Sequence, residues 1–419
     1  METNLSPQYA DTPEGREAET ILRACVHCGF CTATCPTYQL LGDELDGPRG
    51  RIYLIKQVLE GVAPTARTQL HLDRCLTCRS CETTCPSGVR YGRLVDIGRK
   101  IVDDRVGRSP VADARRSALR RGLLSKPLFG AALALGRFAK PLLPARMAAA
   151  IPDAQAAGRW PAARHARRML IPLGCVQPAL APNIDAATAR VLDRAGISAL
   201  AIAGGGCCGA LSYHLSEHDQ ARELARRNID AWWPLVEQGI EAIVVTASGC
   251  GVMVRDYGHL LAQDPAYAQK AQRVAALARD PVEVVAAEWA TLLPQIARSG
   301  AGQRLAFHPP CTLQHGMKIR GEVERLLQAA GYALVPVADA HLCCGSAGTY
   351  SILQPELSRR LKANKLRALE ANGPELVATA NIGCMTQLQS GTALAVRHWI
   401  ELIDQKSAPG PAAAAKRSA

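Results

Sequence analysis

The 419-residue chain contains no apolar run long enough to cross a membrane. Its uncharged stretches at residues 127–136 and 141–145 are much shorter than the roughly 18 to 20 residues that span a bilayer. The first twenty residues carry several carboxylates and no basic segment that leads into an apolar run, so we expect no Sec-type signal peptide. These absences predict a soluble protein of the cytoplasm.

The chain also lacks the fingerprints of nucleotide, flavin and nucleic-acid binding. Gly204–Gly206 precedes Cys207 but completes neither the G-x-G-x-x-G nor the G-x-x-x-x-G-K pattern. Aromatic residues make up 4% of the chain, and no basic face interleaved with aromatics is visible, so we expect no nucleic-acid partner. The sequence therefore predicts no cofactor of its own that could take two electrons from a substrate.

Positive charge is concentrated in one segment of the chain. Residues 99–168 hold 16 Lys or Arg against four Asp, an excess equal to the net charge of +12 of the whole protein. The simplest interpretation is a solvated helical connector. The alternative is a docking strip for an acidic partner or for an anionic membrane surface.

No cysteine is left over from two repeated patterns, although the chain has 16 of them. In a reducing compartment such closely spaced thiols are better interpreted as metal ligands than as disulfides. The first pattern, C-x2-C-x2-C-x3-C-P, occurs twice and comprises Cys25, Cys28, Cys31 and Cys35, then Cys75, Cys78, Cys81 and Cys85. The second pattern, C, C-C-G, C, also occurs twice and comprises Cys175, Cys207, Cys208 and Cys250, then Cys311, Cys343, Cys344 and Cys384.

The first pattern predicts two 4Fe-4S clusters. In two-cluster ferredoxins, three cysteines of a run bind one cluster and the fourth, followed by Pro, binds the other cluster. Zinc ribbons instead use paired C-x2-C knuckles. The predicted ligands are Cys25, Cys28, Cys31 and Cys85 for the first cluster, and Cys75, Cys78, Cys81 and Cys35 for the second.

The second pattern belongs to an internal duplication, because Cys-Cys-Gly follows the first cysteine after the same 32 residues in both copies. Each copy alternates apolar strands with helices that stop at Gly196 or Gly331, and its cysteines follow the strands. Such alternation predicts a parallel sheet flanked by helices, of the form strand, helix, strand, helix, strand. Ligands collect at the carboxyl ends of parallel strands, so we expect the four thiols of each copy to converge.

We therefore predict an α+β multidomain protein, with a helical two-cluster ferredoxin-like domain followed by a duplicated α/β cysteine-rich domain with parallel sheets. The predicted units are the ferredoxin-like domain at residues 1–100, a basic helical linker at 101–168, the first repeat at 169–300, the second repeat at 301–405 and a disordered tail at 406–419. Four further residues are assigned structural roles. They are His308 and His341, expected to be hydrogen-bonded imidazoles, and Trp232 and Trp233, expected to pack in the core.

The duplicated Cys-Cys-Gly pattern resembles the cysteine-rich domain of the heterodisulfide reductase B subunit and its relatives. In that family such thiols hold an unusual iron-sulfur cluster or a zinc ion, and cluster-binding members carry one more cysteine, in a terminal C-x-x-C. Here that position is Met253 in the first repeat and Gln387 in the second. A bound metal or cluster and an empty thiol pocket are both open at these sites.

Longer stretches resemble the family of iron-sulfur subunits of bacterial glycolate oxidase. They are residues 22–38, 41–53, 231–234, 246–251, 341–350 and 397–400. The resemblance implies an oxidoreductase complex in which two flavoprotein-type subunits oxidise glycolate to glyoxylate, and this subunit passes electrons to a quinone or membrane acceptor. It also implies a cytoplasmic protein at the inner face of the membrane.

Two alternatives are open. One is a related electron relay with the same architecture, the equivalent subunit of a lactate or glycerol-3-phosphate dehydrogenase. The other is a thiol-disulfide reductase that uses Cys207, Cys208, Cys343 and Cys344.

Overall fold

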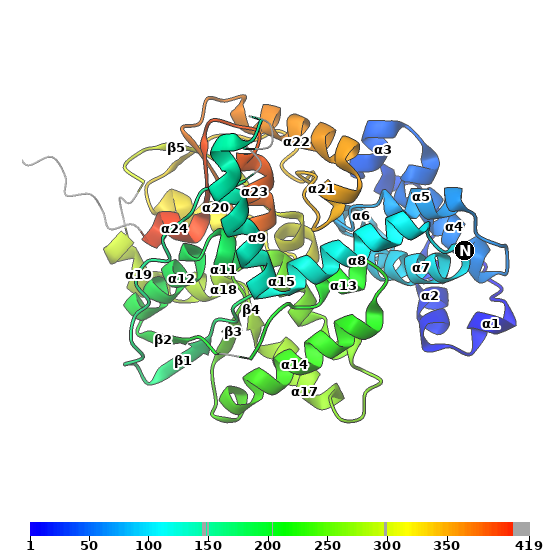
Figure 1. The fold of residues 1–419 in the computed structure, drawn as a ribbon, viewed down its shortest axis with the longest axis horizontal. Coiled ribbons are helices and arrows are strands. Elements are labelled where there is room, and N and C mark those ends of the chain that lie inside the picture. The colour runs from blue at the N-terminus through cyan, green and yellow to red at the C-terminus, as the bar shows by residue number, and fades with distance from the viewer. Residues whose placement is uncertain (145–147, 149–150, 203, 297–299, 405–419) are drawn as a thin grey trace, which may run out of the picture.

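The computed structural model describes residues 1–144, 148, 151–202, 204–296 and 300–404 of the chain. Figure 1 shows a helical block at one end of the molecule, two helices that cross from it, and two α/β repeats that form the rest. The predicted tail at residues 406–419 lies outside the described residues. The architecture confirms the predicted fold class.

Short helices with one common core form the N-terminal block. Leu22, Ile55, Leu59 and Leu94 are fully buried in it, and α4 packs against α7. The elements are α1 (Pro7–Ala10), α2 (Pro13–Ala24), η1 (Phe30–Thr32), α3 (Pro36–Leu41), η2 (Glu44–Asp46), α4 (Pro48–Leu59), α5 (Ala66–Asp73), α6 (Ser80–Thr84) and α7 (Tyr91–Val106).

The basic segment forms the helices α8 (Pro110–Leu124) and α9 (Lys126–Ala139) and the short turn η3 (Lys140–Leu142), as the sequence predicts. None of the three elements has a buried residue. Helix α8 is nevertheless tied to both neighbouring parts of the protein, because Arg116 pairs with Asp73 of the N-terminal block at 3.0 Å and Arg120 pairs with Glu217 of the first repeat. It is a connector held by ion pairs rather than a purely solvated linker.

Each repeat contains a four-stranded parallel sheet, in the order β2-β1-β3-β4 or β6-β5-β7-β8. The strands are β1 (Arg167–Leu170), β2 (Ile197–Leu200), β3 (Ala242–Val244) and β4 (Ala278–Arg279), then β5 (Arg304–His308), β6 (Ala333–Leu334), β7 (Leu376–Thr379) and β8 (Ala395–His398). The prediction of three strands for each repeat was wrong by one. The fourth strand is only two residues long in the first sheet, and in the second it alternates exposed and buried residues, so neither forms an apolar run.

Helices cover both faces of the first sheet, as expected for a parallel sheet. Leu170 and Ile243 face the cluster that contains α14 and α17, whereas Met169 and Val244 face the cluster that contains α12. The first repeat has α11 (Gln177–Leu180), α12 (Asn183–Arg194), α13 (Ala210–His214), α14 (His218–Glu237), α15 (Ser248–Arg255), α16 (Tyr257–Leu260), α17 (Ala268–Leu277), α18 (Pro281–Ala287) and α19 (Trp289–Ile296). Trp232 of α14 is buried in this core, which confirms its predicted role.

The two repeats share one hydrophobic core. Helix α24 of the second repeat packs on α12 of the first, and Arg190 of α12 donates to Asp404 at 2.8 Å. The second repeat has η4 (Thr312–Gly316), a single π-helical turn, with α20 (Glu322–Ala329), α21 (Tyr350–Leu353), α22 (Pro355–Glu370), α23 (Ile382–Gln389) and α24 (Trp399–Asp404). Helices α12 and α20 end just before Gly196 and Gly331, as the sequence predicts. The predicted boundary at residue 300 stays a prediction.

Candidate metal centres

The two N-terminal cysteine loops share an unusual backbone geometry. His27 and Gly29 lie between the first three cysteines of one loop, and Thr77 and Arg79 occupy the same positions in the other. All four residues have positive φ, of 61°, 85°, 51° and 61°. Left-handed backbone is uncommon for residues other than Gly and is retained where the surroundings require it. Because both loops adopt it at matching positions, each turns its three thiols toward one centre.

The thiols group across the two loops. Burial raises the pKa of Cys31 to about 11 and the pKa of Cys81 well above its usual value, and neighbouring thiols add to both shifts. The neighbours are Cys25, Cys85 and Cys28 for Cys31, and Cys78, Cys75 and Cys35 for Cys81. Each loop is thus completed by the fourth cysteine of the other, which supports the exchange of ligands expected for two-cluster ferredoxins. The assignment of ligands stays a prediction.

The first of these centres lies at the surface and has room for a cluster. A pocket of about 430 Å³, counted with its open mouth, is lined by Cys25, Cys28, Cys31 and Cys85. Cys28 is exposed, and beside it Val26 and Phe30 are 67% and 62% exposed. Four thiols around an empty space are the donor set that a 4Fe-4S cluster requires.

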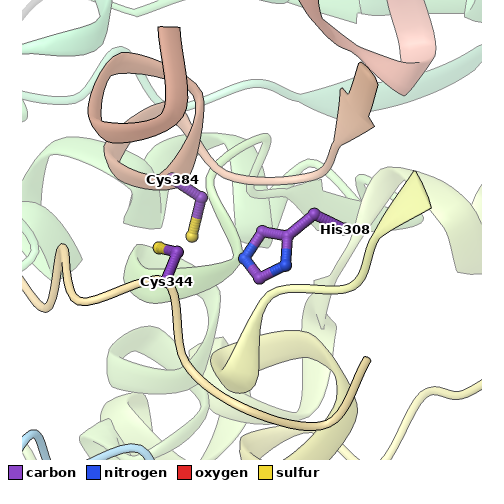
Figure 2. A group of neighbouring side chains, drawn as sticks. All are labelled: His308, Cys344 and Cys384. Atoms are coloured by element: carbon purple, nitrogen blue, oxygen red, sulfur yellow. The ribbon is translucent and has the colours of Figure 1, made fainter. Parts of the chain in front are cut away.

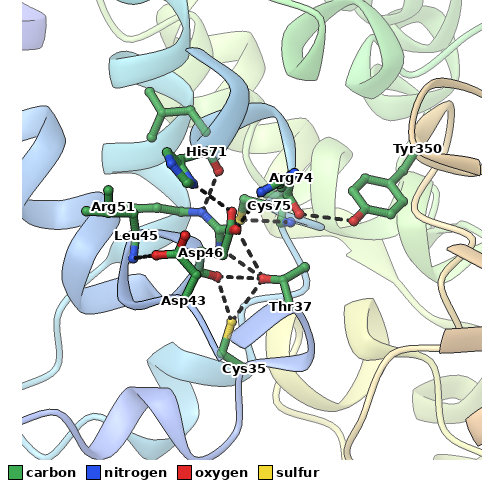
Figure 3. Close-up of polar contacts among 12 residues, drawn as sticks. Cys35, Thr37, Asp43, Leu45, Asp46, Arg51, His71, Arg74, Cys75 and Tyr350 are labelled. Carbon is green, nitrogen blue, oxygen red and sulfur yellow. Dashed lines mark hydrogen bonds and ion pairs between the residues drawn. The ribbon is translucent and has the colours of Figure 1, made fainter. Parts of the chain in front are cut away.

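The second centre is packed against a buried polar network, which Figure 3 shows. Arg51 is 1% exposed and donates to Thr37 at 3.1 Å, to Asp46 at 3.4 Å and to the carbonyl oxygen of His71 at 2.7 Å. The hydroxyl of Thr37 lies 3.3 Å from the sulfur of Cys35. The hydroxyl of Thr37 therefore lies between the positive charge of Arg51 and the sulfur of Cys35, a predicted cluster ligand.

The surroundings of Arg51 favour its protonated, positively charged form. Burial lowers the pKa of Arg51, but Cys75, Tyr91, Cys35 and Asp46 together outweigh burial and raise it. The sequence did not identify this residue as functional. A signal was present, because Arg51 lies four residues before Ile55 and so shares the buried face of α4.

The cysteines of each repeat converge, which confirms the expectation from strand ends. Cys175 follows β1, Cys207 and Cys208 follow β2, and Cys250 lies in α15 after β3. Neighbouring thiols lie close enough to shift one another's pKa values, in a series from Cys175 through Cys207 and Cys208 to Cys250, and in the second repeat from Cys311 through Cys343 and Cys344 to Cys384. A pocket of about 470 Å³ adjoins the site of the first repeat.

The glycine of each Cys-Cys-Gly turn has a structural reason. Gly345 has φ of 83°, and a Cβ there would lie 2.8 Å from the carbonyl oxygen of Ser358. Its N–H donates to the sulfur of Cys343 at 3.4 Å, and Gly209 donates to Cys207 at the same distance. The glycine thus lets the turn fit against the next helix while it directs an N–H at a thiol.

The positions that lack the terminal cysteine are filled by other contacts. Met253 is buried in the core of the first repeat. Gln387 donates from Nε2 to the hydroxyl of Ser358 at 2.8 Å. Neither residue offers a thiol to its site.

His308 differs from its predicted role. It is the last residue of β5 and is 1% exposed, yet neither ring nitrogen has a hydrogen-bond partner. One ring nitrogen and the sulfurs of Cys344 and Cys384 lie within 4.8 Å of one another. Figure 2 shows the three side chains turned toward one another. The prediction of a hydrogen-bonded structural imidazole was wrong, because the strand end directs this ring into the thiol site. His341 lies elsewhere and offers its carbonyl oxygen to Nε2 of His315 at 3.0 Å.

The second cysteine loop adjoins the site of the second repeat. Burial is the largest cause of the raised pKa of Cys78, and the charge of the Cys311 thiol is the next largest. Leu76 and Tyr350 pack with Cys343 in one small cluster between the two parts. Tyr350 also donates to the carbonyl oxygen of Arg74 at 3.1 Å. The helical block is therefore docked so that the two thiol sites face each other.

Comparison with known proteins matches both parts of the chain. Residues 21–89 match the 4Fe-4S dicluster domain, and residues 170–255 and 305–389 match the cysteine-rich domain. The glycolate oxidase iron-sulfur subunit of Escherichia coli (strain K12) is 54% identical over 406 residues, which cover 97% of this chain and 99% of the relative. The chain belongs to this family. These matches support iron-sulfur clusters as cofactors of this chain.

More distant relatives fall within the same family or share part of the chain. The probable glycolate oxidase iron-sulfur subunit of Bacillus subtilis (strain 168) is 31% identical and covers 90% of both chains. A lactate utilization protein A from Exiguobacterium sp. (strain ATCC BAA-1283 / AT1b) is 25% identical over 55% of this chain and 94% of its own. Among the described residues, no helix is both long and apolar enough to cross a membrane.

Proposed function

We propose that this iron-sulfur subunit carries electrons within a glycolate-oxidising complex, from a flavin on partner subunits to a quinone or other membrane acceptor. Oxidation of glycolate to glyoxylate releases two electrons and two protons. Each 4Fe-4S cluster, when bound, accepts and passes one electron at a time. The observation that carries this proposal is the crosswise grouping of the eight N-terminal thiols, because it brings two centres together in one small helical block.

The surroundings of the two cysteine loops favour electron transfer from the first centre to the second. The first loop is exposed at Cys28 and bordered by the apolar side chains of Val26 and Phe30, which makes it the natural contact for a partner subunit. The second loop is more deeply buried and is screened from solvent by the second repeat. Arg51 places a positive charge beside the second centre, which favours a reduced, more negative state there.

A surface on the connector supports peripheral attachment to the inner face of the membrane. Leu128, Leu135, Phe138 and Leu142 recur at helical spacing and are 54%, 68%, 83% and 86% exposed. The excess of positive charge lies in the same segment, residues 99–168. An apolar stripe next to basic residues is typical of helices that lie in the interface of anionic membranes.

The alternatives have less support. A nucleophilic thiol requires a lowered pKa, but burial and neighbouring thiols raise the pKa values of Cys208, Cys343 and Cys344. The lactate utilization relative matches about half of this chain, whereas the glycolate oxidase relatives match nearly all of it.

The experiment is to change Cys28 to Ser in the assembled complex and to follow iron content and flavin reduction by glycolate. We expect the iron of the N-terminal block to fall from about eight per chain to about four, because each cluster holds four. Flavin reduction should persist while electron transfer to a quinone is lost. If flavin reduction itself stopped in a complex that still assembled, the relay would be refuted.

A further inference from the structure

A pocket lies where the helical block meets both repeats, and none of the 16 cysteines lines it. Its volume is about 640 Å³, counted with its open mouth. Its walls come from the second cysteine loop, α7, α13, α15, α16 and the start of η4. We propose that this pocket binds the ring of a quinone, which is reduced there by electrons from the second cluster. The proposal rests on the electron relay proposed above and names the site of its acceptor.

The pocket adjoins the second cysteine loop. Thr77 and Arg79 line it, and these two residues flank Cys78, a predicted ligand of the second cluster. The pocket beside the first centre has no residue in common with it. A ring bound here would therefore take its electrons from the second centre, at which the proposed relay ends.

The charged side chains of the pocket are already paired. Arg93 donates to Asp256 at 3.0 Å, and Arg79 donates to Glu82 at 3.1 Å. Because a carboxylate balances each guanidinium, the pocket has little net attraction for an anion. This pairing favours a neutral ligand.

Apolar side chains form another part of the wall. Val252, Met253 and Leu260 line the same pocket. Sites for small molecules are typically apolar clefts of about 300 to 1,000 Å³ with a few converging polar groups. Apolar surface beside paired charges suits a flat, neutral ring, and the open mouth leaves room for the substituents of the ring.

Tyr213 supplies a hydrogen-bond donor to the pocket. Its hydroxyl has no hydrogen-bond partner among the described residues. Burial raises the pKa of Tyr213, and the charge of Asp96 raises it further, so the hydroxyl stays protonated. The ring of Tyr213 stacks on that of His218, with centroids 4.3 Å apart, which fixes its position. The hydroxyl can therefore donate to a carbonyl oxygen of the quinone.

His214 supplies a proton. Its Nδ1 lies 3.0 Å from a carboxylate oxygen of Asp96, which is 5% exposed. Burial raises the pKa of Asp96, but His214 and Arg99 outweigh burial and lower it, so the carboxylate accepts from Nδ1. Nε2 is then the nitrogen that can deliver a proton to the ring. The side chain of His214 is 43% exposed, so the solvent can replace that proton.

The proposed reduction balances in electrons and protons. Oxidation of one glycolate releases two electrons, and the second cluster passes them one at a time. Two electrons and two protons convert the quinone to a quinol, in which each C=O bond has become a C–O–H group and the ring is aromatic. His214 gives one proton and Tyr213 the other, and water that enters through the open mouth reprotonates both.

The test uses the assembled complex, with glycolate as electron donor and decylubiquinone as acceptor. Tyr213→Phe should raise the KM for decylubiquinone about three- to tenfold, because one hydrogen bond to the ring is lost. His214→Gln should lower quinone-dependent turnover at least about tenfold, because a proton donor is lost. In both variants glycolate should still reduce the clusters, which electron paramagnetic resonance would detect.

Two matched controls remove the same groups outside the pocket. Tyr267 donates to Asp230 at 2.8 Å, and Nε2 of His165 lies 2.9 Å from Asp193. Neither tyrosine nor histidine of these pairs lines the pocket. Tyr267→Phe and His165→Gln should therefore keep the wild-type KM and turnover. Iron content and circular dichroism would establish that all four variants are loaded and folded.

Photolabelling gives a measurement that does not depend on electron transfer. An azidoquinone of the ubiquinone type, activated by light on the wild-type complex, should label peptides that contain α13 or α15, and excess decylubiquinone should prevent the labelling. If glycolate left the wild-type clusters oxidised, the relay would fail and the labelling alone would decide the pocket. Labelling confined to other parts of the complex, or wild-type quinone kinetics in both pocket variants with reducible clusters, would overturn the pocket and leave the relay standing.

Discussion

The positive charge of Arg51 should set the reduction potential of the second cluster. The distances of 3.1 Å from Arg51 to the hydroxyl of Thr37 and 3.3 Å from that hydroxyl to the sulfur of Cys35 place the guanidinium within about 6.4 Å of a predicted ligand. At an effective dielectric constant of about 20, a unit charge at that distance contributes about 2.6 kcal/mol. For a one-electron couple this corresponds to about 110 mV.

Arg51→Met should therefore lower the potential of the second cluster by several tens of millivolts, with about 110 mV as the ceiling. Partial relaxation of the site would reduce the full value. The first cluster should change far less, since Arg51 lies beside Cys35 and Cys75 of the second loop. A redox titration of the reduced clusters followed by electron paramagnetic resonance would measure both potentials.

Two further variants control for the loss of structure. Breaking a buried ion pair costs about 3–5 kcal/mol, so Arg51→Met will also be less stable. Arg51→Lys keeps the charge and should preserve most of the potential while it loses hydrogen bonds. Arg49→Met removes a partly exposed charge, which solvent already screens. If Arg51→Met kept both clusters at their original potentials, the electrostatic reasoning would be refuted.

Three other predictions address stability and membrane contact. Gly345→Ala should destabilise the protein by about 2–5 kcal/mol, against about 1 kcal/mol for Gly348→Ala, because both residues have positive φ but only Gly345 lies against backbone. Burial raises the pKa of Asp280 to about 7, so the native state binds the proton more tightly and stability falls as the pH rises from about 4 to 7. Asp280→Asn should remove that loss and gain up to about 4 kcal/mol over wild type at pH 8, measured by chemical denaturation. Replacing Phe138 and Leu142 with Ser should weaken sedimentation with vesicles that contain phosphatidylserine.

Each of these predictions has a contrary result. Equal unfolding free energies for the two glycine variants would mean that contact with α22 does not constrain the Cys-Cys-Gly turn. A stability difference between wild type and Asp280→Asn that stays constant from pH 5 to pH 8 would exclude titration of this carboxyl. Unchanged vesicle binding, at low and high salt, would remove the connector from the membrane contact.

Much of the fold could be predicted because its signals are local. The helix α4 follows from the spacing of Ile52, Ile55, Val58 and Leu59, and the parallel sheets follow from the duplicated alternation of strands and helices. The strands β4 and β8 were missed because a short edge strand does not have to be apolar. The shared core of the two repeats depends on α24 reaching α12 across more than 200 residues, and no local pattern encodes that contact.

In the sites, too, the features with a local sequence signal could be predicted, and those that depend on distant residues could not. The cysteine motifs predicted the convergence of thiols, since spacing and strand ends determine it. The positions of Arg51 and His308 could not be obtained from their neighbours in sequence. His308 becomes a candidate for a functional role only because it lies beside Cys344 and Cys384, which are far along the chain. Arg51 becomes one because it is the one charged residue on the buried face of α4 and lies near Cys35.

The most direct test of the central proposal is rapid freeze-quench electron paramagnetic resonance of the assembled complex mixed with glycolate. The proposal predicts that signals of reduced clusters in this subunit appear after flavin reduction and before the acceptor is reduced, and that Cys28→Ser abolishes the later step. Turnover to a quinone at the normal rate while both clusters stay oxidised would contradict it.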